Sequence, residues 1–324
     1  PSASGDGRRY CPAVIAALAG GVGAARFLRG LVDVVDPAAV TAVVNTGDDD
    51  EFHGLWVCPD LDSVTYTLAD AHNHAMGWGL EGEAFAAMDA LDRYGASTWF
   101  RLGDRDLATH LFRTERMRSG RTLTEVTAEI GSAWGLATRL LPMTDDRVAT
   151  RITVDDPTGG TRELAMQEWF VRERCEPAVV AVAFAGADQA VPAPGVLDVL
   201  ASAETILICP SNPVISIGPI LAVPGIRDVL ADRRAHVVGV SPIVGGRPVK
   251  GPADRLMGPL GIEVSSVGVA AAYRDFCAAL VVDTVDIGDA DRIASLGVRP
   301  VVTDTLMRDA RVAAALARET LAAV

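Results

Sequence analysis

Six acidic residues within fifteen positions are the leading candidates for chemistry in this chain. They lie in a turn-rich loop and are Asp48, Asp49, Asp50, Glu51, Asp60 and Asp62. A solvated loop is one interpretation of such a run, and a metal site is the other. Carboxylate oxygens without a Cys or His pattern favour Mg²⁺ over zinc. We expect Asp48 and Asp62 to bind the ion and to be catalytic, because they stand at the structured ends of the loop. The acids that directly follow Asp48 are expected to be solvated: Asp49, Asp50 and Glu51.

A glycine-rich turn that precedes this loop has the features of a phosphate-binding turn. It consists of Gly20, Gly21, Val22 and Gly23, between an apolar run at residues 14–19 and a helix-forming stretch at residues 24–31. Glycines let the backbone approach a phosphate, and a helix N-terminus offers free N–H groups. The alternative is a tight turn that only lets a helix pack on a sheet. Arg26 stands where a dinucleotide fingerprint has its third Gly or Ala, and no Gly-Lys-Ser/Thr of a Walker loop follows.

Polar residues that follow other apolar runs extend the candidate site. Asn45 opens the acidic loop, and Ser211 and Asn212 lie between two prolines after the run at residues 205–209. Ser216 continues the same loop into a helix start. Hydroxyl and amide groups bond well to a phosphate or a base edge, although an ordinary turn or helix cap would use the same residues.

Two further motifs carry weaker signals. In the sequence RLGDRD, Asp104 is interpreted as the N-cap of the following helix, and Arg101 is either a surface cation or an anion ligand. His72 and His74 have no triad partner and are expected at the surface. No nucleophile-elbow pattern occurs, so the chain gives no sign of a serine nucleophile.

The elements that must position these residues alternate between strand and helix. Apolar runs at residues 14–19, 40–44, 205–209 and 236–240 each end directly at one of the polar motifs. In a parallel sheet such turns lie together at the carboxyl edge, where open α/β proteins bind ligands. We therefore expect an α/β fold with a doubly wound, mostly parallel Rossmann-like sheet and one shared cleft.

Two segments interrupt this pattern. Residues 64–144 have mostly helical periodicity, and residues 151–170 have the pattern of a β-hairpin around a Pro-Thr-Gly-Gly turn. We predict a nucleotide-binding core from residues 13–63 and 145–324, with residues 64–144 as a helical insertion. An apolar run at residues 179–184 is expected as a further strand.

The charge balance limits the possible partners. With 42 acidic and 29 basic residues the net charge is −13, and Lys250 is the only lysine. Such a surface argues against nucleic acid or an anionic membrane as partner. Two like charges about 4 Å apart repel by roughly 4 kcal/mol near a protein surface. A phosphate ligand therefore needs an Arg, a helix N-terminus or a divalent cation beside it.

The spacing of the cysteines indicates a reducing compartment, and the hydropathy pattern gives no sign of a membrane-spanning segment. The 5 cysteines are scattered without a CxxC pair, so neither a zinc site nor a disulfide framework is indicated. No apolar run reaches ~18 residues, and no signal peptide opens the chain. We expect a cytoplasmic protein with reduced thiols and an irregular arm at residues 1–12.

Several stretches taken together resemble the 2-phospho-L-lactate transferase family. They follow one another in order from about residue 14 to about residue 286: LAGGVGAARFL, VVNTGDD, CPDLDSVTYTL, WFRLGDRDLATHL, LLPMTDD, QEW, PSNPVISIGPIL, GVSPIVGGRPVKGPA and VSSVGVA. The resemblance implies a Mg²⁺-dependent homodimer that acts late in the biosynthesis of coenzyme F-420. Such enzymes join the deazaflavin alcohol Fo to a lactyl, enolpyruvyl or glyceryl phosphate carried on guanosine diphosphate, and release GMP.

The resemblance also implies roles for individual residues. The resemblance implies that the diphosphate contacts Gly20, Gly21, Val22 and Gly23, and that the nucleotide contacts Asn45, Ser211, Asn212 and Ser216. It also implies that Asp48 and Asp62 bind the metal ion. Asp62 and Arg101 are the residues that it implies for contact with Fo. The acid run departs from the family pattern, because Asp50 and Glu51 stand where relatives often have apolar or aromatic residues.

Two alternatives remain at this stage. A non-catalytic regulatory protein of the same superfamily, which binds nucleotide sugars, would share the GGxG and PSNP loops but should lack the CPDLD and RLGDRD motifs. A nicotinamide oxidoreductase is disfavoured by Arg26. Among donors, enolpyruvyl is favoured over lactyl, because the use of Arg in place of Lys suggests a GC-rich actinobacterial genome.

Overall fold

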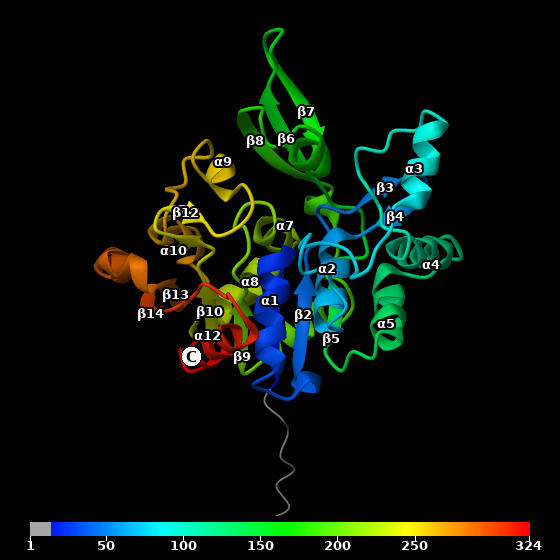
Figure 1. The fold of residues 1–324 in the computed structure, drawn as a ribbon. Coiled ribbons are helices and arrows are strands. Elements are labelled where there is room, and N and C mark those ends of the chain that lie inside the picture. The colour runs from blue at the N-terminus through cyan, green and yellow to red at the C-terminus, as the bar shows by residue number, and fades with distance from the viewer. Residues whose placement is uncertain (1–13) are drawn as a thin grey trace, which may run out of the picture.

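The computed structural model describes residues 14–324, so the expected arm at residues 1–12 and Cys11 lie outside the described residues. Seven parallel strands form the central sheet (Figure 1), in the order β14-β13-β10-β9-β1-β2-β5. Their bounds are Ile15–Ala19 (β1), Val40–Val44 (β2), Arg139–Pro142 (β5), Thr205–Ile208 (β9), Val237–Val240 (β10), Ala279–Asp283 (β13) and Arg299–Thr303 (β14). The strand order reverses between β1 and β9, as in doubly wound folds. The predicted fold class is therefore confirmed.

Helices cover both faces of this sheet, because its central strands are apolar on both sides. Ile15, Ala17 and Ala19 of β1 belong to one buried cluster, and Ala16 and Leu18 belong to the other. The first cluster includes residues of α1 (Gly21–Val32), α2 (Pro59–Leu68) and α12 (Ala310–Leu321). The second includes residues of α6 (Val196–Ser202), α7 (Ile217–Ala222), α8 (Ile226–Asp232), α9 (Ala253–Met257), α10 (Ser266–Tyr273) and α11 (Ala290–Ser295). None of the described helices combines the length and apolar composition needed to cross a membrane.

The segment between β2 and β5 is mostly helical, as expected, and lies to one side of the sheet (Figure 1). It contains the short antiparallel pair β3 (Asp50–Phe52) and β4 (Leu55–Val57), then α2 and the helices α3 (Ala86–Arg93), α4 (Asp106–Arg118) and α5 (Leu123–Ala133). Strand β5 falls inside the range 64–144 that the sequence assigned to the insertion, yet it pairs with β2 in the central sheet.

A separate three-stranded antiparallel sheet lies at the top of Figure 1. The predicted hairpin is confirmed as β6 (Ala149–Asp155) and β7 (Thr161–Ala165). The expected strand at residues 179–184 exists as β8 (Val179–Ala185), but it pairs antiparallel with β6 and takes no part in the parallel sheet. An apolar sequence does not specify its pairing partner, and much of β8 is exposed, with Val180 45% exposed.

Candidate functional site at the carboxyl edge of the sheet

Three of the predicted loops meet at one point beside β1. A methyl group in place of a hydrogen on Gly20 would lie 2.7 Å from Cβ of Ser216 and 3.3 Å from Cβ of Asn45. At Gly23 it would lie 2.3 Å from the carbonyl oxygen of Pro210. The glycine turn, the acidic loop and the PSNP loop therefore converge, as the predicted strand order required.

The glycine turn leads directly into α1. Helix α1 begins at Gly21, whose φ of 71° favours glycine, and its N-cap residue Gly20 supplies no side chain to bond the first N–H groups. These backbone donors and the positive end of the helix dipole point out of the turn. The arrangement suits an anion such as a diphosphate.

Three carboxylates are buried beside this turn. Asp48, Asp49 and Asp60 are 7%, 3% and 6% exposed. The expectation that Asp49 is solvated is therefore wrong, whereas Glu51 is exposed and Asp50 is half-buried in an ion pair with Arg147. Asp49 is buried because the loop folds back, and its amide bonds to the carbonyl of Thr46.

Burial makes this group of carboxylates hard to ionise. It raises the pKa of Asp60 to about 6, although hydrogen bonds from Asn45 and from the Gly21 amide oppose the shift. Burial, together with repulsion from Asp60 and Asp49, raises the pKa of Asp48 well above its usual range. Burial also raises the pKa of Asp49 well above its usual range, although the Cys58 thiol and the charge of Arg113 oppose the shift. Oδ1 of Asp48 and both carboxylate oxygens of Asp49 have no hydrogen-bond partner among the described residues.

Such a group of carboxylates fits a divalent cation. Carboxylate oxygens without partners are the ligands that Mg²⁺ prefers, and burial raises the pKa of the adjoining Cys58 thiol, which disfavours the thiolate that a soft metal would need. Asp60 lies next to the glycine turn, since a methyl group on Gly20 would be 2.9 Å from its Oδ2. A cation held here would be close to an anion at the start of α1.

In the protein freed of metal, ionisation of Asp60 is expected to cost stability as the pH rises. Its pKa is about 6 in the folded chain and about 3.9 in an unfolded one. The folded chain therefore holds more protons between these values, and its free energy of unfolding falls as the pH rises through them, by ~3 kcal/mol in all. Denaturant unfolding with chelator should show Asp60→Asn gaining stability relative to the wild type from about pH 4 to about pH 7. If the difference in stability between Asp60→Asn and the wild type does not change with pH, the raised pKa of Asp60 would be contradicted.

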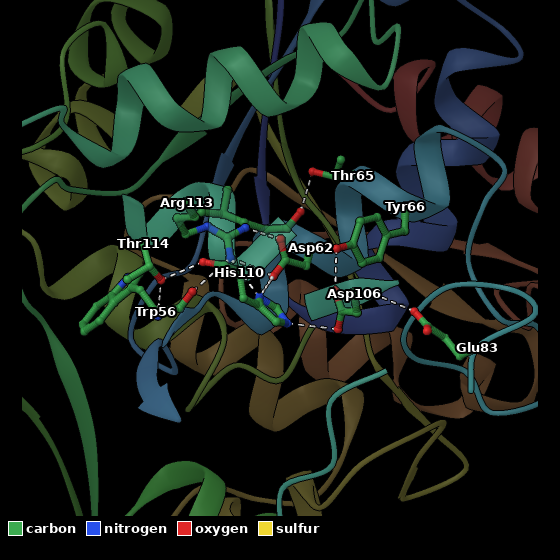
Figure 2. Close-up of polar contacts among 10 residues, drawn as sticks. Trp56, Asp62, Thr65, Tyr66, Glu83, Asp106, His110, Arg113 and Thr114 are labelled. Atoms are coloured by element: carbon green, nitrogen blue, oxygen red, sulfur yellow. Dashed lines mark hydrogen bonds and ion pairs between the residues drawn. The ribbon is translucent and has the colours of Figure 1, made fainter. Parts of the chain in front are cut away.

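Asp62, the other predicted metal ligand, lies in a different environment (Figure 2). Its two oxygens accept hydrogen bonds from the two terminal guanidinium nitrogens of Arg113, one of them at 3.1 Å. Arg113 is 2% exposed. Burial opposes its charge, yet Asp62 leaves the pKa of Arg113 raised.

A chain of buried polar groups continues from this pair. Nδ1 of His110 lies 3.7 Å from Oδ2 of Asp62, and Nε2 lies 3.1 Å from Oδ2 of Asp106. The hydroxyl of Tyr66 donates to Oδ1 of Asp106 at 2.5 Å. Asp106, His110 and Arg113 come from one face of α4, and Asp62 and Tyr66 from one face of α2 (Figure 2). The network thus joins the insertion to the helix that follows the acidic loop.

Single ligand atoms of Asp62, Asp106 and His110 lie within 4.8 Å of one another, which is the spacing of a metal site. Arg113, however, already supplies a buried positive charge there, and a second cation would be repelled. The unneutralised carboxylates of Asp48 and Asp60 offer the better metal site. Asp60, which the sequence-based selection left out, therefore joins the candidate residues.

The PSNP loop presents unused donors next to the glycine turn. The hydroxyl of Ser211 and the amide nitrogen of Asn212 are buried without a hydrogen-bond partner among the described residues. Asn45 has a structural role, since its amide bonds both Asp60 and the carbonyl of Ile215 and its Oδ1 accepts from Gly47. Ser216 is 8% exposed and is the N-cap residue of α7.

The insertion adds an aromatic wall to the edge of the site. A cavity of about 340 Å³ lies between β3 and residues 97–100, and the rings of Phe52 and Phe100 stack there at 4.0 Å. The neighbouring Arg101 is 43% exposed in its side chain, pairs with Asp89 at 2.7 Å and lies over the ring of Phe85. Arg101 is therefore reachable from solvent but is not in the buried acid group.

Asp104 has a different role from the one predicted. Its carboxylate accepts from the amides of Ala86 and Ala87 at 3.0 Å each, so it caps the start of α3 and not the helix that follows it. The amides of Arg105 and Asp106 instead donate to Glu83.

Comparison with known proteins identifies the family of this chain. Residues 15–320 match the family model of 2-phospho-L-lactate transferase CofD. The chain is 45% identical over 309 residues to a protein named phosphoenolpyruvate transferase from Streptomyces griseus, covering 95% of this chain and 97% of that protein. Proteins of the same name from Streptomyces coelicolor and Mycolicibacterium smegmatis are 46% and 40% identical, over 95% and 94% of this chain and 97% and 96% of theirs.

Among solved structures, a UPF0052 family protein from Bacillus halodurans is similar with a TM-score of 0.61 at 16% identity, covering 96% of this chain and 99% of that one. At this identity the likeness supports the α/β fold alone. The family match spans both the nucleotide loops and the insertion. The chain therefore belongs to the 2-phospho-L-lactate transferase CofD family.

Proposed function

We propose that this protein transfers a phosphoenolpyruvyl group from a guanosine diphosphate-linked donor to the ribityl hydroxyl of the deazaflavin Fo, with release of GMP, in coenzyme F-420 biosynthesis. The enolpyruvyl donor is favoured over phospholactyl because the similar proteins above are named phosphoenolpyruvate transferases. The observation that carries the proposal is the group of buried, unneutralised carboxylates beside an uncapped helix N-terminus. Together they provide a place for a diphosphate and for the cation that it needs.

Asp48 and Asp60 would hold Mg²⁺, and the oxygens of Asp49 are available beside them. A bound Mg²⁺ neutralises phosphate charge and polarises the transferring group. The amides of the glycine turn would bind the diphosphate, and Ser211 and Asn212 would donate to the nucleotide. Without a cation, the carboxylates would repel the same diphosphate.

The acceptor side is assigned to the insertion. Asp62 and Arg101 are proposed to contact Fo, with Arg113 holding the Asp62 carboxylate in a fixed orientation. The cavity beside Phe52 and Phe100 offers an aromatic surface to a flat deazaflavin ring. In the reaction, the Fo hydroxyl oxygen forms a bond to the phosphorus that carries the enolpyruvyl group. The bond from that phosphorus to the bridging oxygen breaks, GMP leaves with that oxygen, and the hydroxyl proton passes to solvent. Positioning and charge neutralisation suffice, so no protein nucleophile is required.

The direct test is incubation with Fo, Mg²⁺ and each candidate donor. Enolpyruvyl-diphosphoguanosine is expected to yield GMP and an Fo phosphodiester identified by its mass. Omission of Mg²⁺ with added EDTA should abolish the product, because the carboxylates would then face the diphosphate unneutralised. Full activity in chelator would remove the metal from the proposal, and no product with any donor would refute the function.

A homodimer is proposed to form along strand β8. This strand is apolar throughout and lies at the edge of its sheet, with Val180 45% exposed. An unpaired apolar edge invites another strand, and antiparallel pairing of β8 with its copy satisfies a two-fold axis. Light scattering should give a dimer for the wild type and a monomer for Val180→Lys. A dimeric Val180→Lys variant would place the interface elsewhere. Cys58, Cys175, Cys209 and Cys277 are buried and form no disulfide within residues 14–324, which fits a reducing compartment such as the cytoplasm.

A further inference from the structure

Two basic side chains near the glycine turn have no role in the function described so far. Arg26 lies on α1, four residues after Val22 of the turn, and so on the same face of the helix. Helical side chains lean toward the N-terminus, which brings the Arg26 guanidinium toward the turn. Lys250, the only lysine of the chain, reaches the same region from the loop that follows β12 (Arg247–Pro248).

Arg26 and His72 line one small pocket, and Lys250 lies against the loop that forms its wall. Arg26, His72 and Val22 line a small pocket between α1, α2 and the loop at residues 72–79. A methyl group on Gly77 of that loop would lie 2.7 Å from Nζ of Lys250, so the ammonium rests against the loop. Nδ1 of His72 is buried without a hydrogen-bond partner among the described residues.

The two cations of this group form no ion pair with the described part of the protein, although Asp70 and Glu81 act electrostatically on the neighbouring His72. Within residues 14–324, neither Arg26 nor Lys250 takes part in an ion pair, although the chain has an excess of acidic residues. Burial and then repulsion from Arg26 lower the pKa of Lys250. An anion between them would remove this repulsion.

We propose that Arg26, Lys250 and His72 form a carboxylate-binding subsite that holds the three-carbon acid of the donor. This inference rests on the proposed function. The donor differs from GDP by an acid whose carboxylate needs its own counter-charge, because the amides of the glycine turn are used by the diphosphate. The buried acid group repels a carboxylate, whereas these three side chains attract one and can donate to it. The subsite thereby distinguishes the loaded donor from GDP.

The single lysine makes a direct measurement possible. Reductive methylation with ¹³C-formaldehyde keeps the charge of Lys250 and labels no other side chain. With Mg²⁺ present, enolpyruvyl-diphosphoguanosine is expected to shift the Lys250 methyl signal in the NMR spectrum, and GDP is expected to leave it nearly unchanged. A signal that responds equally to the two ligands would assign Lys250 to the diphosphate and overturn the proposal.

Affinities provide the second arm of the test. Lys250→Gln and Arg26→Gln should each weaken donor binding about tenfold or more in calorimetry, with GDP affinity changed less than about twofold. Arg311→Gln is the matched control, because it removes a cation whose side chain is 93% exposed. Arg311 lies on α12, near Ala313, which packs against Gly30 at the far end of α1 from the glycine turn. This variant should change neither affinity. Equal loss of donor and GDP binding, or no loss, would refute the subsite. Failure of the wild type to bind or use the donor would instead refute the proposed function.

Discussion

Asp48→Asn is expected to lower the rate of phosphoenolpyruvyl transfer about 100- to 1,000-fold, as removal of a single group that stabilises developing charge does in other enzymes. Asp48 is buried, and burial with repulsion from Asp60 and Asp49 raises its pKa well above the usual range. The amide keeps the shape of the side chain but removes the charge that would bind Mg²⁺. The same change relieves repulsion in the metal-free protein, so its melting temperature should rise by about 2–4 °C.

Product formation and thermal unfolding in chelator measure the two effects on the same sample. Asp50→Asn is the matched control, because Asp50 belongs to the same acid run but is half-buried and paired with Arg147 at 2.9 Å. It should retain activity within about twofold of the wild type. A variant Asp48→Asn that keeps more than about a tenth of the activity, or that is less stable than the wild type, would show that Asp48 is not part of a metal site.

Arg113→Met is expected to destabilise the protein by about 3–5 kcal/mol, since it leaves the Asp62 carboxylate buried without its partner. The loss should appear in denaturant unfolding as a lower midpoint with an unchanged slope. Arg113 is 2% exposed and also donates to the carbonyl of Trp56 at 3.3 Å. Its removal therefore loosens the contact of α4 with the strand β4 and with α2.

A double-mutant cycle separates the pair from the packing. The variant Asp62→Leu/Arg113→Met removes both charges and should recover at least about 2 kcal/mol relative to Arg113→Met alone. If the double variant is no more stable than Arg113→Met, the network owes its stability to shape and not to charge. A loss below about 1 kcal/mol for Arg113→Met would show that water reaches the carboxylate.

The fold and the meeting of the loops could be predicted because the central strands are continuous apolar runs. Residues 40–44, for example, are buried without exception, as expected for a strand covered on both faces. Parallel order then places the ends of β1, β2 and β9 at one edge, and the contacts at Gly20 and Gly23 confirm it. These inferences need only local composition and chirality of the connections.

The choice among the acids could not be predicted in this way. Asp60 and Asp62 are two residues apart on α2, yet one faces the glycine turn and the other faces Arg113. That difference depends on where α2 and α4 cross, which is a tertiary property. Asp60 was one of the six acidic candidates, but nothing in the sequence ranked it above Asp62.

Helix α4 shows the limit of periodicity most clearly. Its apolar spacing predicts the helix correctly, but Leu111 is 56% exposed while His110 and Arg113 are buried. The hydrophobic pattern therefore gives the wrong inner face. A signal was present in the spacing of Asp106, His110 and Arg113, which repeats one helical face with groups that can neutralise one another. The interpretation of Asp104 as the N-cap of the following helix was wrong because it considered only local sequence. The Asp104 carboxylate instead caps α3, at Ala86, eighteen residues earlier in the chain.

The place of the insertion in the sheet has an evolutionary consequence. Helices α3 to α5 enter between β2 and the edge strand β5, whereas the glycine turn and the PSNP loop follow the inner strands β1 and β9. A connection to a border strand tolerates new lengths and new sequences without rearranging the interior. Under the proposed function, related proteins could acquire a preference for another acceptor molecule by rebuilding this one segment, with the turns that follow β1 and β9 left unaltered.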